Sequence, residues 1–362
     1  MNPTEKPSLK SLKNRRRRVQ LSAADLVRET PLFDSQSLPL SIEPVAAELR
    51  LTIWAQQNRD RLLSRLHTYG GVLLRGFQVR DAEDFGAFVA AISTEPMTYS
   101  YRSTPRSQVH GKVYTSTEYP ADRTIPLHNE MAYARQWPMM LAFHCQQPAT
   151  EQGETPIADS HRVLAQIPEV IRQEFANRGI CYVRNYGDGL DLPWQEVFQT
   201  QSRQQVETIC HDAQIDFEWW GDDRLRTRQV CQAIATHPHT GKAVWFNQSH
   251  LFHISNAGAA QEYLKANFDP ICWPRNAYFG DGGEISEEIL EAIRAAFAAE
   301  TVVFPWQAGD VLLLDNMAVA HGRRPFSGPR RVLAGMADPY SAAGGVPDAV
   351  AEDVPKLQQE VS

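Results

Sequence analysis

The 362-residue sequence has few cysteines and no pair of them at metal-binding spacing. It therefore belongs neither to the disulfide-rich proteins nor to the proteins built around a zinc cluster. Cys145, Cys181, Cys210, Cys231 and Cys272 are odd in number, widely separated and without a Cys-x-x-Cys motif. We therefore expect reduced thiols, not a disulfide framework or a zinc cluster. Reduced thiols favour a cytoplasmic location.

Long apolar runs and an excess of positive charge are also missing. No stretch approaches the length of a membrane span, and no apolar segment follows Arg15 to Arg18 as it would in a secretory signal. The formal net charge is -7, which gives no electrostatic basis for binding nucleic acid or an anionic membrane. We expect neither as a partner.

Hydrophobic residues make up 43% of the sequence, enough for a substantial core. Neither a repeat nor a proline-rich linker divides the chain. We predict a disordered basic tail at residues 1–20, one domain at residues 21–340, and a polar, acidic tail at residues 341–362. The arginine run in the first tail is either a docking arm or simply solvated.

The order of apolar patterns predicts a mixture of helices and strands. Residues 42–69 have the spacing of an amphipathic helical region, residues 72–74 form a short buried strand, and residues 82–92 form a second helix after Asp81. Residues 97–126 are polar and aromatic, typical of a surface loop or of a lid over a site.

Later segments repeat the alternation of strand and helix. Strand patterns occupy residues 139–146 and 311–314, and a turn at residues 153–157 leads into another short strand. Helical patterns occupy residues 161–179 and 286–299.

His128 and Glu130 stand two residues apart, so on a strand their side chains leave the same face and can bind one ion. Such a pair arises by chance more often than not. A third ligand is needed to distinguish a metal site from a chance pair. His321 follows the strand at residues 311–314 across the turn Asp315-Asn316 and can supply that ligand. Two imidazoles and a carboxylate with open positions are the ligand set of non-haem Fe(II) oxygenases.

At this point residues 66–339 resemble the TauD/TfdA superfamily of Fe(II)- and 2-oxoglutarate-dependent dioxygenases, most closely its SyrP-like branch. The resemblance is carried by an ordered series of motifs: Ile125-Pro-Leu-His-Asn-Glu-Met, Gly153-Glu-Thr-Pro-Ile-Ala-Asp, Arg184-Asn-Tyr, His237-Pro-x-Thr-Gly, Trp245-Phe-Asn-Gln, Gly309-Asp-Val and His321-Gly-Arg-x-Pro-Phe-x-Gly-Pro-Arg-Arg.

The resemblance implies that His128, Glu130 and His321 bind Fe(II). It also implies that Arg331 binds the distal carboxylate of 2-oxoglutarate and that the Thr155 hydroxyl assists it. Planar guanidinium suits a carboxylate.

Arg330 competes with Arg331, because adjacent strand residues point to opposite faces and only one can enter the pocket. We favour Arg331. Asn129, Arg184 and Asn247 are the candidate substrate contacts. Taurine-type members carry a further arginine where this chain has Gly335, so we do not expect a sulfonate substrate.

The predicted fold is α+β, with a double-stranded β-helix (jelly-roll) core decorated with helices. The implied reaction consumes 2-oxoglutarate and O2, releases succinate and carbon dioxide, and hydroxylates an unactivated carbon. The SyrP-like branch implies specialised metabolism and a small-molecule substrate, an amino acid or peptide-like molecule that is free or tethered to a carrier protein.

Several alternatives stay open at this point. Desaturation or epoxidation could replace hydroxylation, and a zinc hydrolase or a non-catalytic binding module could use the same scaffold. The sequence does not define the oligomeric state, so a homo-oligomer is open as well. The remaining candidate metal ligands are expected to serve packing, a turn or the substrate wall: His144, His237, His239, His250 and His253.

Overall fold

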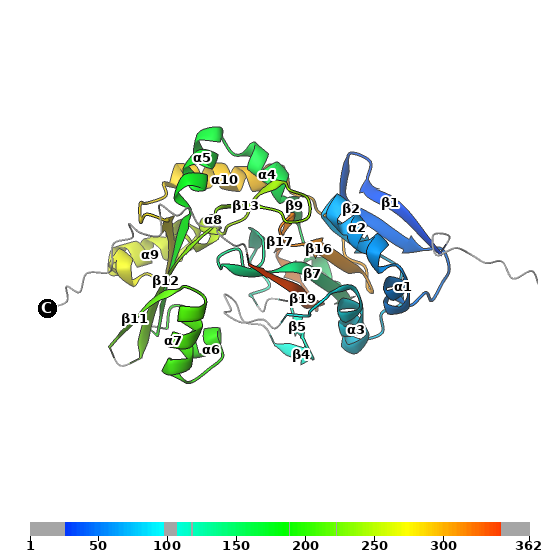
Figure 1. The fold of residues 1–362 in the computed structure, drawn as a ribbon, viewed down its shortest axis with the longest axis horizontal. Coiled ribbons are helices and arrows are strands. Elements are labelled where there is room, and N and C mark those ends of the chain that lie inside the picture. The colour runs from blue at the N-terminus through cyan, green and yellow to red at the C-terminus, as the bar shows by residue number, and fades with distance from the viewer. Residues whose placement is uncertain (1–25, 98–106, 117–118, 188, 222, 342–362) are drawn as a thin grey trace, which may run out of the picture.

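A computed structural model describes residues 26–97, 107–116, 119–187, 189–221 and 223–341 (Figure 1). These residues form a mixed structure with five sheets and ten α-helices. The predicted N-terminal tail lies outside the described residues, as does the predicted C-terminal tail apart from Ser341.

An eight-stranded main sheet runs through the centre of the molecule. Among the described strands of this sheet, β2 and β3 pair in parallel and all other neighbours pair antiparallel. In spatial order its strands are β1 (Val27–Phe33), β2 (Gln36–Pro44), β3 (Gly71–Leu74), β16 (Val311–Asp315), β7 (Gln136–Gln147), β19 (Arg331–Ser341), β5 (Val113–Thr115) and β4 (Gln108–His110).

Three helices cover one face of this sheet: α1 (Leu51–Gln57), α2 (Arg59–Tyr69) and α3 (Ala82–Ile92). The predicted helix at residues 82–92 and strand at residues 72–74 are confirmed. Asp81 caps α3 by accepting a hydrogen bond from the Asp84 N–H at 2.8 Å.

The prediction that a helical region begins at Ile42 is wrong, because Ile42 lies in β2 and the first helix begins at Leu51. Residues 38–42 are buried without interruption, as in a strand that is covered on both faces. Parallel pairing of β2 with β3 places these side chains in the core.

A three-stranded minor sheet carries the candidate metal ligands. Its order is β6 (Ile125–His128), β17 (Val319–Arg323) and β9 (Ile157–Asp159), all antiparallel. Helices α4 (Ser160–Gln166), α5 (Glu169–Arg178) and α10 (Glu287–Ala299) lie on this side of the molecule (Figure 1). The predicted helix at residues 161–179 is two helices, because Pro168 forces the residue before it out of helical conformation.

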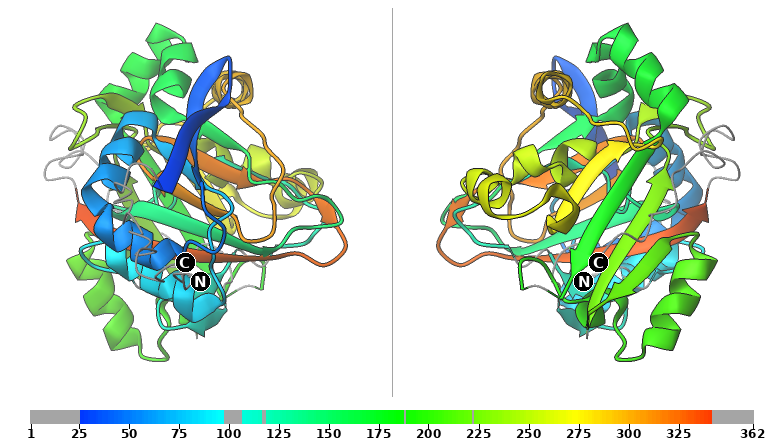
Figure 2. Two further views of the ribbon diagram at one scale, coloured as in Figure 1. Left: turned by 90° about the vertical axis from the view of Figure 1, so that its right-hand side faces the viewer. Right: turned by 90° about the vertical axis from the view of Figure 1, so that its left-hand side faces the viewer.

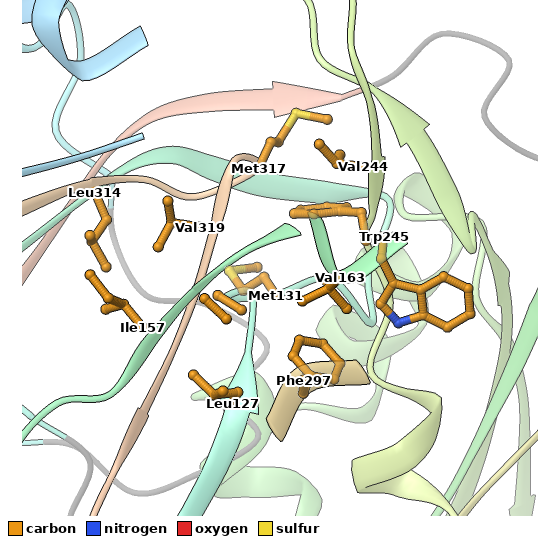
Figure 3. Close-up of a cluster of buried hydrophobic side chains, with 14 of the residues drawn as sticks. Leu127, Met131, Ile157, Val163, Val244, Trp245, Phe297, Leu314, Met317 and Val319 are labelled. Atoms are coloured by element: carbon orange, nitrogen blue, oxygen red, sulfur yellow. The ribbon is translucent and has the colours of Figure 1, made fainter. Parts of the chain in front are cut away.

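Buried apolar side chains join the two sheets to α4 and α10 (Figure 3). Leu127, Ile157 and Val319 come from the minor sheet, and Leu314 comes from the main sheet. Phe297 of α10 packs into the same cluster. The strands that hold the candidate ligands are therefore fixed by core packing.

A four-stranded outer sheet lies at the end of the molecule opposite the β1/β2 hairpin (Figure 2). Its order is β11 (Asp216–Trp220), β12 (Arg224–Cys231), β10 (Ile180–Tyr186) and β15 (Arg275–Phe279). The other elements are α6 (Trp194–Phe198), α7 (Arg203–Asp212), α8 (Ser249–Phe252), α9 (Ala260–Asn267), the paired strands β13 (Ile234–Thr236) and β14 (Ala243–Trp245), the paired strands β8 (Glu151–Gln152) and β18 (Phe326–Ser327), and two short 3-10 helices at Ile254–Asn256 and Pro270–Cys272.

All five cysteines are free, in agreement with the sequence. Among the described residues, no helix combines the length and apolarity that crossing a membrane requires.

Candidate metal centre

His128, Glu130 and His321 converge at one point between β6 and β17. One ligating atom from each side chain lies within 4.8 Å of the other two. Ligands about 2.1 Å from one transition metal lie at most about 4.2 Å apart, so this spacing is compatible with one bound ion. Glu130 and His321 are buried, at 2% and 5% exposure. This donor set of two imidazoles and one carboxylate fits Fe(II) and leaves positions open.

The pairing of β6 with β17 brings the two imidazoles together. His128 and His321 are direct partners across the antiparallel pair, and their ring centroids lie 4.5 Å apart. Gly322 permits this close approach, because a Cβ atom there would lie 2.6 Å from the Ile125 carbonyl oxygen.

Two hydrogen bonds orient the strand that carries His128. Its Nδ1 lies 2.8 Å from the Pro126 carbonyl oxygen, so the hydrogen sits on Nδ1 and Nε2 keeps the lone pair that a metal needs. The preceding carbonyl, that of Leu127, lies 2.9 Å from His250 Nε2.

A cavity lies directly beside the two imidazoles. The residues that line it come from β5, β6, β7, β17, β19 and the segments next to them: Ser116, Ile125, His128, Phe143, Thr155, His321, Gly322, Arg323, Arg330 and Val332.

Arg330, not Arg331, faces this cavity. Its Nε donates to the Gly153 carbonyl at 2.9 Å, whereas Arg331 is exposed. The prediction that Arg331 enters the pocket is therefore wrong. The two residues do point to opposite faces, but a register shift beside Arg331 in the β19/β7 pair obscures the facing in the sequence.

Burial lowers the pKa of the Arg330 guanidinium to about 10, and the charge of Arg323 acts in the same direction. Cys145 and Glu154 oppose this shift more weakly. A bound carboxylate would offer this partly buried cation an anionic partner.

Thr155 lies in the same cavity at 4% exposure. Its Oγ1 accepts a hydrogen bond from Trp306 Nε1 at 3.1 Å. The hydroxyl hydrogen can then be donated to a ligand beside Arg330.

Arg323 lines the cavity too, although the sequence did not single it out. It is 5% exposed and donates to the carbonyl oxygens of Tyr119 at 2.9 Å, Pro120 at 2.5 Å and Arg123 at 2.9 Å. Its position two residues after His321 on one strand is the signal that could have found it.

The structure does not place the three predicted substrate contacts in this cavity. Asn129 and Asn247 are both 0% exposed, and their amide nitrogens donate to the carbonyl oxygens of Asn316 and Ala233. A role in substrate contact does not fit these two residues, because their side chains are buried and hydrogen-bonded inside the protein. Arg184 lies on β10 at 1% exposure, and its contact with substrate stays a prediction.

The rival histidines lie outside the cavity. Burial lowers the pKa of His144, and it lowers the pKa of His250 and His253 to about 4, as expected for interior packing. His237 and His239 lie near Asp315, where His67, His237 and Asp315 form a second group of potential ligands. The sequence did not predict this grouping, since its members come from distant segments.

We predict that His250 makes stability depend on pH. Because its pKa falls from 6.5 to about 4 on folding, the unfolded chain binds the extra proton between these values, and stability is lost as pH falls below 6.5. At pH 5 the loss is about 2 kcal/mol. Urea unfolding of metal-free protein at pH 7.5 and pH 5 measures it. His250→Gln keeps a donor for the Leu127 carbonyl and should show a smaller pH dependence, whereas an unchanged one would contradict the assignment.

Comparison with known proteins gives one family over most of the chain. The family described as "Taurine catabolism dioxygenase TauD, TfdA family" matches residues 34–337. Dapdiamide synthesis protein DdaC of Enterobacter agglomerans is 45% identical over 292 residues, covering 80% of this chain and 88% of that protein. A clavaminate synthase-like protein of Arabidopsis thaliana is 34% identical over 335 residues, covering 86% and 98%.

Solved structures share the fold at low sequence identity. The PvcB protein from Pseudomonas aeruginosa matches with a TM-score of 0.52 and 17% identity, covering 88% of this chain and 93% of that one. A structure of AAD-2 in complex with Mn(II) and N-oxalylglycine matches with a TM-score of 0.50 and 11% identity, covering 86% and 96%.

Proposed function

The chain belongs to the taurine catabolism dioxygenase TauD, TfdA family, and we propose that it hydroxylates an unactivated carbon of an amino acid or peptide-like substrate. As a family member it is an Fe(II)- and 2-oxoglutarate-dependent dioxygenase. One observation carries the proposal: the cavity beside His128 and His321 also contains Arg330 and Thr155. Two of the three candidate metal ligands thus share one pocket with a pair of side chains that can bind a carboxylate.

The residues in and beside this pocket divide into three roles. His128, Glu130 and His321 hold the iron, which when bound supplies the oxidising chemistry that side chains lack. Arg330 binds the distal carboxylate of 2-oxoglutarate, and Thr155 donates its hydroxyl to the same group. Phe143 and Val332 close the apolar wall of the cavity and limit the access of water.

The same pocket disfavours the alternative of a zinc hydrolase. Hydrolysis needs a metal and water, and it would leave the partly buried Arg330 cation and the Thr155 hydroxyl without an anionic ligand. We further assign the main and minor sheets to a double-stranded β-helix, because residues from both sheets line the cavity beside the candidate ligands. The fold-level match to PvcB supports this assignment.

Two features support the proposed substrate class. The relative named for dapdiamide synthesis is 45% identical, which favours biosynthesis of a specialised metabolite. A sulfonate remains unexpected, because no arginine follows four residues after either candidate: Ala334 follows Arg330 and Gly335 follows Arg331. Gly335 also packs against Val89 of α3, where a Cβ would already lie at 3.0 Å.

Succinate release, measured against a panel of free and carrier-bound amino acids, tests the proposal. The protein is loaded with Fe(II) without oxygen and then exposed to air. We expect one substrate group to stimulate succinate release and to gain an oxygen atom by mass spectrometry. Glu130→Ala is the control for adventitious iron. Stimulation that survives in this variant, or a substrate that loses two hydrogens without gaining oxygen, would contradict hydroxylation at this site.

A further inference from the structure

Asn316 lies at the turn between β16 and β17 and is 0% exposed. Its side chain makes three hydrogen bonds to backbone groups of the segment that follows His128. Oδ1 accepts from the Glu130 N–H at 2.7 Å, and Nδ2 donates to the carbonyl oxygens of Glu130 at 2.9 Å and Pro138 at 2.8 Å. One carboxamide therefore holds both backbone polar groups of Glu130.

Further hydrogen bonds connect both Asn316 and this segment to the rest of the protein. The Asn316 carbonyl accepts from Asn129 Nδ2 at 2.7 Å, and the Asn129 carbonyl accepts from Gln248 Nε2 at 2.7 Å. The Asn316 N–H donates to the Met139 carbonyl of β7 at 2.8 Å. The backbone of Glu130 is thus fixed to the main sheet through buried groups.

Asp315, the preceding residue, fixes the other half of the centre. Its Oδ1 accepts from the N–H groups of Met317 at 3.1 Å and Ala318 at 3.2 Å, which form the turn into β17 and lead to His321. Its Oδ2 accepts from His237 Nε2 at 2.8 Å.

The geometry around His237 indicates that this residue holds Asp315 in place by a hydrogen bond and does not form part of a second metal site. His237 Nδ1 accepts from the N–H groups of His239 and Thr240, both at 3.2 Å, so its hydrogen must lie on Nε2. A nitrogen that carries a hydrogen cannot bind a metal, and this one donates to Asp315 instead. His67 and Asp315 alone would leave only two ligands.

We propose that the Asp315-Asn316 turn is the positioning element of the metal centre. Asn316 holds the backbone of Glu130 and Asp315 holds the turn that delivers His321, so adjacent side chains set the spacing of ligands from two separate strands. The inference rests on the proposed function, in which these ligands bind iron. Loss of an outer partner of this kind weakens metal binding by about 10- to 100-fold.

The Fe(II) affinity of full-length variants tests the role of Asn316. We expect Asn316→Ala to weaken anaerobic Fe(II) binding, measured by calorimetry, by about 10- to 100-fold. Asn247→Ala is the matched control, since Asn247 is also 0% exposed and also donates to a backbone carbonyl, but its side chain hydrogen-bonds to Ala233 and Ser249. It should lower thermal stability while changing metal affinity by less than about threefold. If Asn316→Ala does not fold, Asn316→Ser carries the test, because a serine hydroxyl is too short to reach both groups of Glu130.

A double-mutant comparison shows whether Asn316 acts through Glu130. In a Glu130→Ala background, Asn316→Ala should have little further effect on metal affinity, because the ligand it positions is gone. Equal effects in both backgrounds would overturn the inference, as would an affinity loss matched by Asn247→Ala. Failure of the unaltered protein to bind about one Fe(II) would instead refute the proposed function.

Discussion

His128→Ala and His321→Ala are each expected to abolish the weak visible band that develops when 2-oxoglutarate chelates protein-bound Fe(II). Each substitution removes one of three protein ligands, and the two imidazoles face each other with centroids 4.5 Å apart. Loss of a direct ligand should weaken binding more than loss of an outer partner, hence by more than about 100-fold. Absorption spectra of anaerobic protein with one equivalent of Fe(II) and excess 2-oxoglutarate measure the effect.

His161→Ala is the matched control for these variants. His161 is exposed, and its Nδ1 lies 2.8 Å from the Ala243 carbonyl oxygen, outside both groups of potential ligands. The control should keep the full band. Full retention of the band in both His128→Ala and His321→Ala would contradict the metal assignment.

Arg330→Ala should raise the KM for 2-oxoglutarate by about 10- to 200-fold, whereas Arg331→Ala should change it little. A charge-assisted hydrogen bond from a partly buried cation contributes about 1.5 to 3 kcal/mol, and the cavity places that cation at position 330. Arg331 is exposed and serves as the control for losing a positive charge at the adjacent position.

Steady-state succinate formation at varied 2-oxoglutarate, with the preferred substrate saturating, separates the two variants. Arg330→Lys should recover part of the loss, since lysine keeps the charge but not the planar pair of donors. A larger effect at Arg331 than at Arg330 would show that the strand faces the other way.

Local patterns were sufficient for much of the fold. Helix α3 follows a capping Asp81 and has regular apolar spacing, so its bounds could be read from the sequence. The pairing of strands from distant segments could not be read from the sequence. The strand that contains Ile42 is buried by parallel contact with β3, which no local pattern encodes.

The candidate site divides in the same way. His128 and Glu130 could be found because strand geometry relates residues two apart, and His321 followed from the next turn motif. The choice between Arg330 and Arg331 depends on a register shift beside Arg331, and one residue of slip exchanges the faces of a strand. Asn316 acts on Glu130 across 186 residues of chain, which is visible only in three dimensions.

The origin of the oxygen atoms tests the central claim most directly. With 18O2 and the true substrate, a 2-oxoglutarate-dependent hydroxylase should place one labelled atom in succinate and the other in the product. Mass spectrometry of both molecules, made by Fe(II)-loaded protein in unlabelled water, measures this. Labelled succinate together with a labelled alcohol is the result we predict. Succinate without label would contradict the account, and it would do so whether the product oxygen came from O2 or from water.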